Sequence, residues 1–250
     1  MIEVEALTKT YGDTCVLNSV SVQLAKSGVT AIIGPNGAGK STLLSILGRL
    51  LKADGGSARV DGLDLATTPG DVIARRLSFL RQDNHMSARL TVRELVTFGR
   101  YPYSKGRYTP NDKAHVERAI GFLGLEKLAE RFLDELSGGQ RQRAFIAMVV
   151  CQDTDYMLLD EPLNNLDIKH AITIMQLIRD TAHQFGKTVV VVLHDINMAA
   201  AYCDHIIIMK NGAVIEHGPP QKIMTDELLS SVYDADVSVH TVAERLVAIY

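Results

Sequence analysis

The sequence predicts an α/β fold with a mostly parallel central sheet, an antiparallel β part and an inserted helical region. Three short apolar segments, residues 29–33, 156–159 and 189–193, each end at a glycine or a polar residue. Such near-continuous apolar strands, followed by helical patterns, are typical of a parallel sheet buried on both faces. The carboxyl ends of these strands meet at one edge, which is where ligands of such sheets bind.

The remaining elements follow in chain order. Residues 1–30 and 57–65 alternate in a strand-like way and predict the antiparallel part. Residues 91–150 have a helical pattern that begins with Thr91 as an N-cap and Glu94 three residues later. The pair Asn211–Gly212 lies between two apolar segments and predicts a β-hairpin. A helix over 226–233 and a strand pair within 237–250 complete the chain; packing is the ordinary role for residues 226–250, and a regulatory role is the alternative.

Composition excludes several classes of function. The 250 residues are 46% hydrophobic, which suits a packed core, and their formal charge of −3 provides no basic surface for nucleic acid. The 3 cysteines are scattered without metal-ligand or disulfide spacing, which indicates a reducing compartment. We expect no export signal and no membrane-spanning segment. If the protein acts at a membrane, other chains must span it.

A glycine-rich segment follows the first of the three strands. Residues 34–41 match the pattern G-x-x-x-x-G-K-[S/T] between a predicted strand and a helix expected from about Ser41. Its glycines let backbone N–H groups converge on phosphate oxygens, and the helix N-terminus adds a favourable dipole. We expect Lys40 to contact the β- and γ-phosphates and Ser41 to bind Mg²⁺; a chance match is the alternative. The predicted nucleotide-binding residues here are Gly34, Pro35, Asn36, Gly37, Ala38, Gly39, Lys40, Ser41 and Thr42.

Two adjacent carboxylates, Asp160 and Glu161, follow the second strand at the same edge. Such a pair is costly to bury unless a cation is near. Asp160 is placed to hold Mg²⁺, and Glu161 to polarise the water that attacks the γ-phosphate. An N-cap and a solvated turn residue are the alternatives. His194 follows the third strand. A histidine at such a position is ordinarily a helix cap or a hydrogen-bonded core residue, and the functional alternative is a contact to the γ-phosphate.

Three further features are individually weak. Residues 136–140, Leu-Ser-Gly-Gly-Gln, precede a predicted helix, so Ser137 is either an N-cap or part of an anion-binding helix N-terminus. Gln82 is either an exposed loop residue or a contact to Mg²⁺ and the attacking water. Tyr11 either packs in a turn or stacks on a nucleotide base.

Together these residues resemble the ATP-binding cassette (ABC) family over nearly the whole chain. Residues 34–41 resemble its Walker A motif, 136–140 its signature, 160–161 its Walker B aspartate and catalytic glutamate, and 165–167 its D-loop. Gln82 resembles the Q-loop glutamine, His194 the switch histidine and Tyr11 the adenine-stacking aromatic. The resemblance implies a P-loop NTPase fold with a RecA-like core and a single nucleotide-binding domain over residues 1–250. The ATP-binding core would comprise about 1–85 and 152–250, and the helical signature subdomain about 86–151.

The resemblance also implies how the site is assembled. Two cassettes of this family pair head to tail, and each P-loop faces the partner's signature. Glu161, His194 and Gln82 would be catalytic, Asp167 would belong to the D-loop, and Ser41, Gln82 and Asp160 would hold Mg²⁺. The signature residues that would contact ATP bound by a second copy are Ser137, Gly138, Gly139 and Gln140. An isolated subunit should bind ATP but hydrolyse it slowly.

A narrower resemblance concerns residues 98–103, Phe-Gly-Arg-Tyr-Pro-Tyr. This stretch resembles the cassettes of ferric-siderophore, haem and vitamin B12 importers, and residues 153–156 and 160–170 resemble a subset found with catecholate siderophores. A Pro-containing turn is the alternative. The resemblance implies that residues 82–108 contact a permease. Arg81 stands where many relatives have proline, which frees the backbone there and would change that contact.

The leading hypothesis is an ATPase that powers siderophore import from the cytoplasmic face of the cell membrane. Its partners would be a second copy, two permease subunits and, indirectly, a substrate-binding protein, without nucleic acid. Haem and cobalamin import are alternatives. A soluble ABC ATPase without a transport role is the alternative from another class, which the single cassette without insertions disfavours. The transported ligand, the permease and the role of residues 226–250 stay open.

Overall fold

A six-stranded, mostly parallel sheet forms the centre of the molecule. The computed structural model describes residues 1–24, 26–84, 88–164 and 166–250. The strand order is β10-β9-β3-β8-β7-β6, and β9, β3, β8, β7 and β6 run parallel. Their bounds are β3 Gly28–Ile33, β6 Leu77–Leu80, β7 Tyr156–Leu159, β8 Thr188–Val192, β9 His205–Lys210 and β10 Ala213–Gly218. The predicted parallel sheet is confirmed. Because β3, β7 and β8 run parallel, the segments that follow their carboxyl ends lie at the same edge of the sheet.

Both faces of this sheet are covered, which explains why its strands read as continuous apolar runs. In β3, Val29, Ala31 and Ile33 pack into one apolar cluster, with residues of the helices over one face. Ile32 points the other way into a second cluster with residues of the antiparallel sheet. The helices between the strands include α1 (Lys40–Leu47), α2 (Gly70–Ile73), α7 (Ile168–Gln184) and α8 (Ile196–Tyr202).

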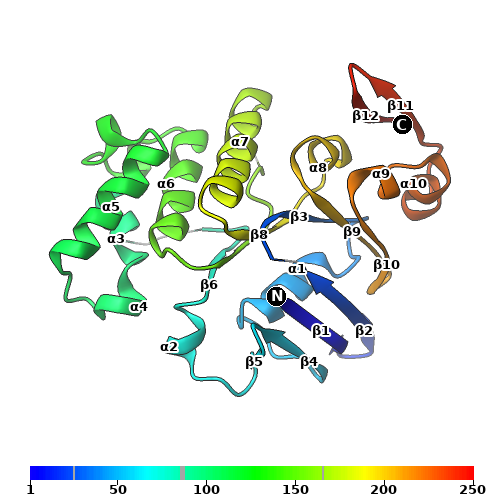
Figure 1. Cartoon of the computed structure of the whole chain (residues 1–250), viewed down its shortest axis with the longest axis horizontal. Coiled ribbons are helices and arrows are strands. Elements are labelled where there is room, and N and C mark those ends of the chain that lie inside the picture. The colour runs from blue at the N-terminus through cyan, green and yellow to red at the C-terminus, as the bar shows by residue number, and fades with distance from the viewer. Residues whose placement is uncertain (25, 85–87, 165) are drawn as a thin grey trace.

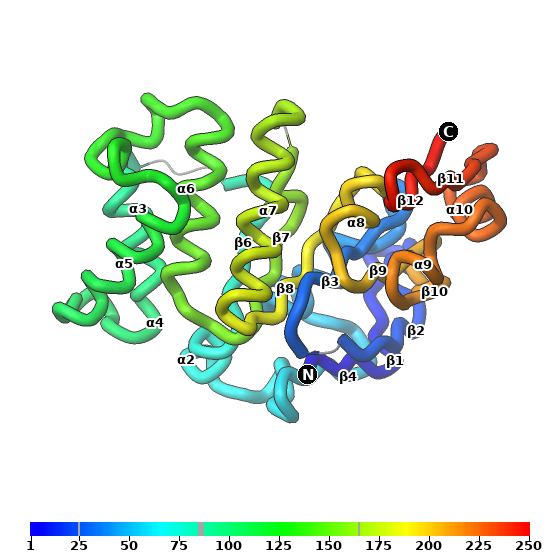
Figure 2. Tube along the Cα trace, turned by 45° about the horizontal axis from the view of Figure 1, so that its top comes forward, coloured from blue at the N-terminus to red at the C-terminus, as the bar shows by residue number. Residues whose placement is uncertain are grey.

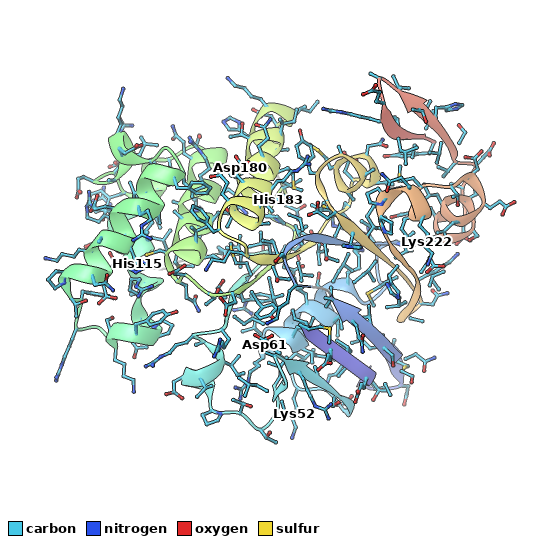
Figure 3. All side chains as sticks on the ribbon, viewed as in Figure 1. Lys52, Asp61, His115, Asp180, His183 and Lys222 are labelled. Carbon is cyan, nitrogen blue, oxygen red and sulfur yellow. The ribbon has the colours of Figure 1, made fainter. Side chains whose placement is uncertain are left out.

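The antiparallel sheet contains β1 (Ile2–Tyr11), β2 (Thr14–Leu24), β4 (Gly55–Val60) and β5 (Leu63–Asp64), in the order β2-β1-β4-β5. The sequence predicts residues 1–30 in this antiparallel part, but residues 28–30 belong instead to β3 of the parallel sheet. Asp61, in the turn between β4 and β5, accepts hydrogen bonds from Tyr156 Oη at 2.6 Å and Lys26 Nζ at 2.8 Å. Because Tyr156 begins β7, Asp61, labelled in Figure 3, ties the two sheets together through this hydrogen bond.

The helical region lies at one end of the molecule, beside α7 (Figures 1 and 2). It contains α3 (Val92–Phe98), α4 (Tyr101–Ser104), α5 (Pro110–Phe122) and α6 (Gly138–Cys151), with single 3-10 turns η1 (Glu126–Leu128) and η2 (Leu133–Glu135). The predicted cap is confirmed, because Thr91 and Glu94 form a reciprocal capping box at the start of α3. Arg100 and Asp112 form a buried ion pair at 3.0 Å that joins this region internally.

The C-terminal part lies at the opposite end (Figure 1). The predicted Asn211–Gly212 hairpin is confirmed, since both residues have positive φ angles and connect β9 to β10. Two more elements match expectation, the helix α10 (Asp226–Tyr233) and the strand pair β11 (Ser238–Val242) and β12 (Arg245–Ile249), which follow α9 (Pro220–Ile223). Within the described ranges, no helix combines the length and apolar character needed to cross a bilayer.

Candidate functional site

The glycine-rich loop, residues 34–39, connects β3 to α1 and depends on two of its glycines. A Cβ at Gly34, where φ is 145°, would lie 2.0 Å from the carbonyl oxygen of Met209. A Cβ at Gly39, where φ is 95°, would lie 2.7 Å from the carbonyl oxygen of Val16. Both positions combine left-handed backbone with no room for a side chain, so only glycine fits. Ser41 and Thr42 follow in the first turn of α1.

Lys40 is buried and bends back over this loop. Its Nζ donates to the carbonyl oxygens of Gly34 and Pro35, at 2.8 and 2.9 Å. Burial lowers the pKa of the ammonium group, and the nearby carboxylates of Glu161 and Asp160 partly oppose that shift. Because the hydrogen bonds of this buried cation go to neutral carbonyls, it is matched to a ligand that brings negative charge, such as a phosphate group.

Asp160 lies directly beside Ser41. The Ser41 hydroxyl donates to Asp160 Oδ1 at 2.9 Å, which joins the end of β7 to the start of α1. Burial raises the pKa of Asp160 and the neighbouring Glu161 adds to this, while the Ser41 hydrogen bond opposes it. A cation at this position would stabilise the ionised form.

The donor set here fits Mg²⁺. Among the described residues, no three His, Cys, Asp or Glu side chains gather in a way that could hold a metal alone. Mg²⁺ commonly takes one or two protein oxygens and completes its shell with phosphate oxygens and water. Ser41 and Asp160 offer a hydroxyl and a carboxylate within hydrogen-bond distance of each other, so the residues present suit a cation that arrives with a phosphate ligand.

The three predicted catalytic residues lie together, with Gln82 and His194 both bonded to Glu161. Its buried carboxylate contacts His194 Nε2 through Oε1 at 2.7 Å, and Gln82 Nε2 donates to Oε2 at 2.7 Å. The amide of Asn164 also donates to Oε2. The backbone of Glu161 has a φ of 46°, a left-handed value that is uncommon for a residue other than glycine. Strain of this kind clusters at functional sites.

The signature segment begins α6. Ser137 is the N-cap and forms a capping box with Gln140, which accords with the structural alternative and leaves its role towards a nucleotide a prediction. Gly138 is exposed, and a Cβ there would meet nothing within 4 Å. Gly139 packs against the ring of His170, where a Cβ would lie 2.5 Å from a ring carbon. His170 in turn contacts Asp167 at 2.8 Å, so the D-loop aspartate and the signature share one neighbour.

A hollow of about 160 Å³ lies between α6 and the turn that carries Glu161. Gln142 of α6 spans part of it, because its Nε2 donates to the carbonyl oxygen of Pro162 at 2.9 Å. Arg141 donates to the carbonyl oxygen of Asn84, beyond Gln82, at 3.0 Å. The signature helix is therefore bonded to both segments that surround the Glu161 carboxylate.

Two predicted residues lie outside this cluster of contacts. Tyr11, at the end of β1, exposes half of its surface, with Lys9 Nζ 5.5 Å from its ring centroid. Arg81 is exposed, and its carbonyl oxygen accepts a hydrogen bond from Asn84 at 2.6 Å. Asn165, part of the predicted D-loop, lies outside the described residues.

Sequence reasoning missed Asn164, Gln142 and His170 as neighbours of the site. Asn164 offered the best signal, since Asn three residues after a strand-end carboxylate readily bonds within a turn. The other two reach the site only through the packing of α6 and α7. No local pattern in the sequence marks those contacts.

Comparison with known proteins agrees with the geometry. A family model described as ABC transporter matches residues 17–164. The petrobactin import ATP-binding protein YclP of Bacillus subtilis is 46% identical over 250 residues, covering 100% of this chain and 99% of that protein. The ferric enterobactin transport ATP-binding protein FepC of Escherichia coli is 41% identical, covering 92% and 85%.

Solved structures are similar as well. The ATP-binding cassette MJ0796, in a dimeric post-hydrolysis state bound to ADP and Pi, has a TM-score of 0.78 and 31% identity, covering 88% of this chain and 99% of that one. CbiO1 from Clostridium perfringens, part of the transporter complex cbiONQ, has a TM-score of 0.80 and 29% identity, covering 92% of each. The chain therefore belongs to the ABC transporter family, as one of its ATP-hydrolysing subunits.

Proposed function

We propose that this chain hydrolyses ATP to power the import of a ferric siderophore. The observation that carries the proposal is the end-to-end similarity, at 46% identity, to a protein named for petrobactin import. A relative named for ferric enterobactin supports the same class of cargo. The substrate would be bound by other chains, with a catecholate siderophore as the first candidate and haem or cobalamin as alternatives.

The contacts around Glu161 support a mechanism of hydrolysis. Lys40 would exchange its two carbonyl partners for the β- and γ-phosphates, and Tyr11 would stack on the adenine. Ser41, Asp160 and Gln82 would hold Mg²⁺, which neutralises phosphate charge when bound. Glu161 would accept a proton from the water that attacks the γ-phosphorus, and His194 would donate a hydrogen bond to the γ-phosphate.

We infer further that two copies assemble head to tail. Residues 1–85 and 152–250 would bind ATP, and the subdomain of residues 86–151 would present Ser137, Gly138, Gly139 and Gln140 to the partner's ATP. The dimeric state of the MJ0796 cassette supports this arrangement. Asp167, exposed at the N-terminus of α7, would lie at the junction between the two copies.

The exposed aromatic residues of the helical region support a permease contact. Phe98, Tyr101 and Tyr108 are 43%, 57% and 37% exposed, whereas Arg100 between them is buried. Within 98–103, Gly99 and Arg100 thus serve the packing of α3, α5 and α6, and the side chains of Phe98 and Tyr101 remain available to a partner. We place the protein at the cytoplasmic face of the membrane, held by two permease subunits, with the substrate-binding protein contacting the permease.

Iron uptake in a strain that lacks this gene tests the proposal. The strain would receive a labelled ferric catecholate siderophore and one of three versions of the chain: native, Glu161→Gln, or Glu227→Gln. Glu227 provides a matched control, because it is an exposed carboxylate in α10 at the other end of the molecule. We expect the native and Glu227→Gln chains to restore uptake and Glu161→Gln to fail.

Normal uptake without the gene would contradict the siderophore assignment, and labelled haem and cobalamin would then distinguish the alternatives. Recovery of uptake with Glu161→Gln would contradict the base role while leaving the cargo supported. If deletion of the gene reduces the import of none of these three cargoes, while the purified chain still hydrolyses ATP, the result would favour an ABC ATPase without a transport role.

A further inference from the structure

We propose that Asn164 is a positioning residue that holds the Glu161 carboxylate in place while ATP is hydrolysed. The proposal rests on the base role of Glu161 proposed above. It assigns a task to a side chain that the sequence motifs did not mark. The inference comes from the way Asn164 binds Glu161 at two points.

The two points are the side chain and the backbone. The Asn164 Nδ2 donates to Glu161 Oε2, and the Asn164 backbone N–H donates to the Glu161 carbonyl oxygen at 3.2 Å. Together they close the turn over residues 161–164 around a left-handed residue, since φ at Glu161 is 46°. A non-glycine residue keeps such a conformation only where its surroundings fix it. Asn164 supplies two of the bonds that do so.

The other two partners of the carboxylate have tasks elsewhere in the proposed mechanism. Gln82 would turn towards Mg²⁺, and His194 would turn towards the γ-phosphate. The contact of His194 is to Oε1, whereas Asn164 donates to Oε2. When ATP binds, Oε1 would therefore be released to face the attacking water. Oε2 would stay bound to Asn164, the one partner that lies within the same turn.

A carboxylate held through one oxygen has a defined direction for the other. Free rotation about the side-chain bonds of Glu161 would leave Oε1, the atom that accepts the proton, without a fixed direction. Small misplacements of a reacting group lower the rate by large factors. Asn164 donates a neutral hydrogen bond, so it orients the carboxylate without supplying a competing charge. Aspartate has the same shape but would place a second negative charge against Oε2.

The test measures turnover and ATP affinity of the purified full-length chain with Asn164→Ala and Asn164→Asp. Asn18→Ala is the matched control, because Asn18 is an exposed asparagine in β2. We expect Asn164→Ala to lower kcat by about 10- to 100-fold, and Asn164→Asp to lower it further. For Asn164→Ala, the dissociation constant for ATP and the thermal midpoint should stay near the native values, because the backbone hydrogen bond that closes the turn remains.

A double-mutant cycle with Glu161→Gln separates positioning from a general structural effect. Residual hydrolysis would be followed in long single-turnover incubations with labelled ATP. If Asn164 acts through Glu161, adding Asn164→Ala to Glu161→Gln lowers the residual rate no further. An equal loss in both backgrounds would overturn the proposal, as would a native kcat for Asn164→Ala beside an inactive Glu161→Gln. Native turnover in Glu161→Gln itself would instead remove the base role on which the proposal depends.

Discussion

At the scale of single residues, the site is held ready by polar groups that bond to one another. Lys40 donates hydrogen bonds to two carbonyl oxygens, and Ser41 donates one to Asp160. Gln82 and His194 both contact the carboxylate of Glu161. Each of these groups would exchange a protein partner for a phosphate, a metal or a water molecule. Binding therefore replaces hydrogen bonds that already exist, and little side-chain freedom is lost in the exchange.

Replacing Lys40 by Ala should weaken ATP binding by about 10- to 100-fold, because one charge-assisted contact to phosphate is removed. Titration calorimetry with ATP measures the change. Lys52→Ala is the control, since Lys52 is an exposed lysine beyond the far end of α1 (Figure 3). Equal affinities for the two variants would contradict the proposed role of the loop.

Replacing Glu161 by Gln should preserve ATP affinity and abolish turnover, because the amide keeps the shape of the side chain but cannot accept the proton. The uncleaved ATP should then hold two copies together. Size-exclusion chromatography with and without ATP detects this dimer. A variant that turns over normally and stays monomeric with ATP would exclude Glu161 as the base.

At the scale of elements, the start of α6 depends on a close contact with α7. The His170 ring lies against Gly139 and is held by Asp167, so three segments meet at one small residue. A larger residue at 139 would displace the ring, which is also bonded to the aspartate. The contact therefore makes the orientation of α6 sensitive to a single methyl group.

Gly139→Ala should lower the free energy of unfolding by about 1–2 kcal/mol through overpacking. Gly138→Ala should be neutral or raise it by up to about 1 kcal/mol, since alanine favours helix and meets open space. Urea unfolding of both variants measures the difference. Adding His170→Ala should restore part of the loss in Gly139→Ala, and a loss that persists unchanged would refute the proposed clash.

The sequence predicted elements better than contacts. The buried strands, the Asn211–Gly212 hairpin and the Thr91 cap depend on local patterns, and the structure confirms them. The convergence of Asp160, Glu161 and His194 followed from parallel strands that end at one edge. The bond from Gln142 to Pro162 and the packing of His170 on Gly139 depend on how helices far apart in sequence approach each other. Such approaches leave no periodic signal in the chain.

At the scale of the whole molecule, Asp61 joins the antiparallel sheet to the parallel sheet. Burial alone would raise its pKa, but hydrogen bonds from Lys26, the Met1 ammonium and Tyr156 outweigh burial and lower it. A pKa lower in the folded state than in the unfolded state means that the unfolded chain takes up the proton first as pH falls. The stabilisation is therefore present above about pH 4 and is lost as the pH drops further.

Asp61→Asn should lower the free energy of unfolding at pH 7 by about 1–3 kcal/mol, because hydrogen bonds to a charged group become neutral ones. Asparagine tolerates the left-handed backbone at this position, where φ is 50°, so strain should not contribute. Urea unfolding at pH 7 and pH 3 tests this, with Asp13→Asn, in the exposed turn after β1, as control. The gap between native and Asp61→Asn should narrow at pH 3, and a constant gap would contradict the ionic link.

The hydrogen bond from Gln142 to Pro162 would couple the two ATP sites within a pair of subunits. In a head-to-tail pair, the α6 of one chain would face one ATP molecule, while the Glu161 turn of the same chain would face the other. The bond joins these two segments inside a single chain. Each nucleotide would then alter the affinity of the other by the same factor, as reciprocal linkage requires. The two ATP molecules would communicate through the interior of each subunit, in addition to the surface between subunits.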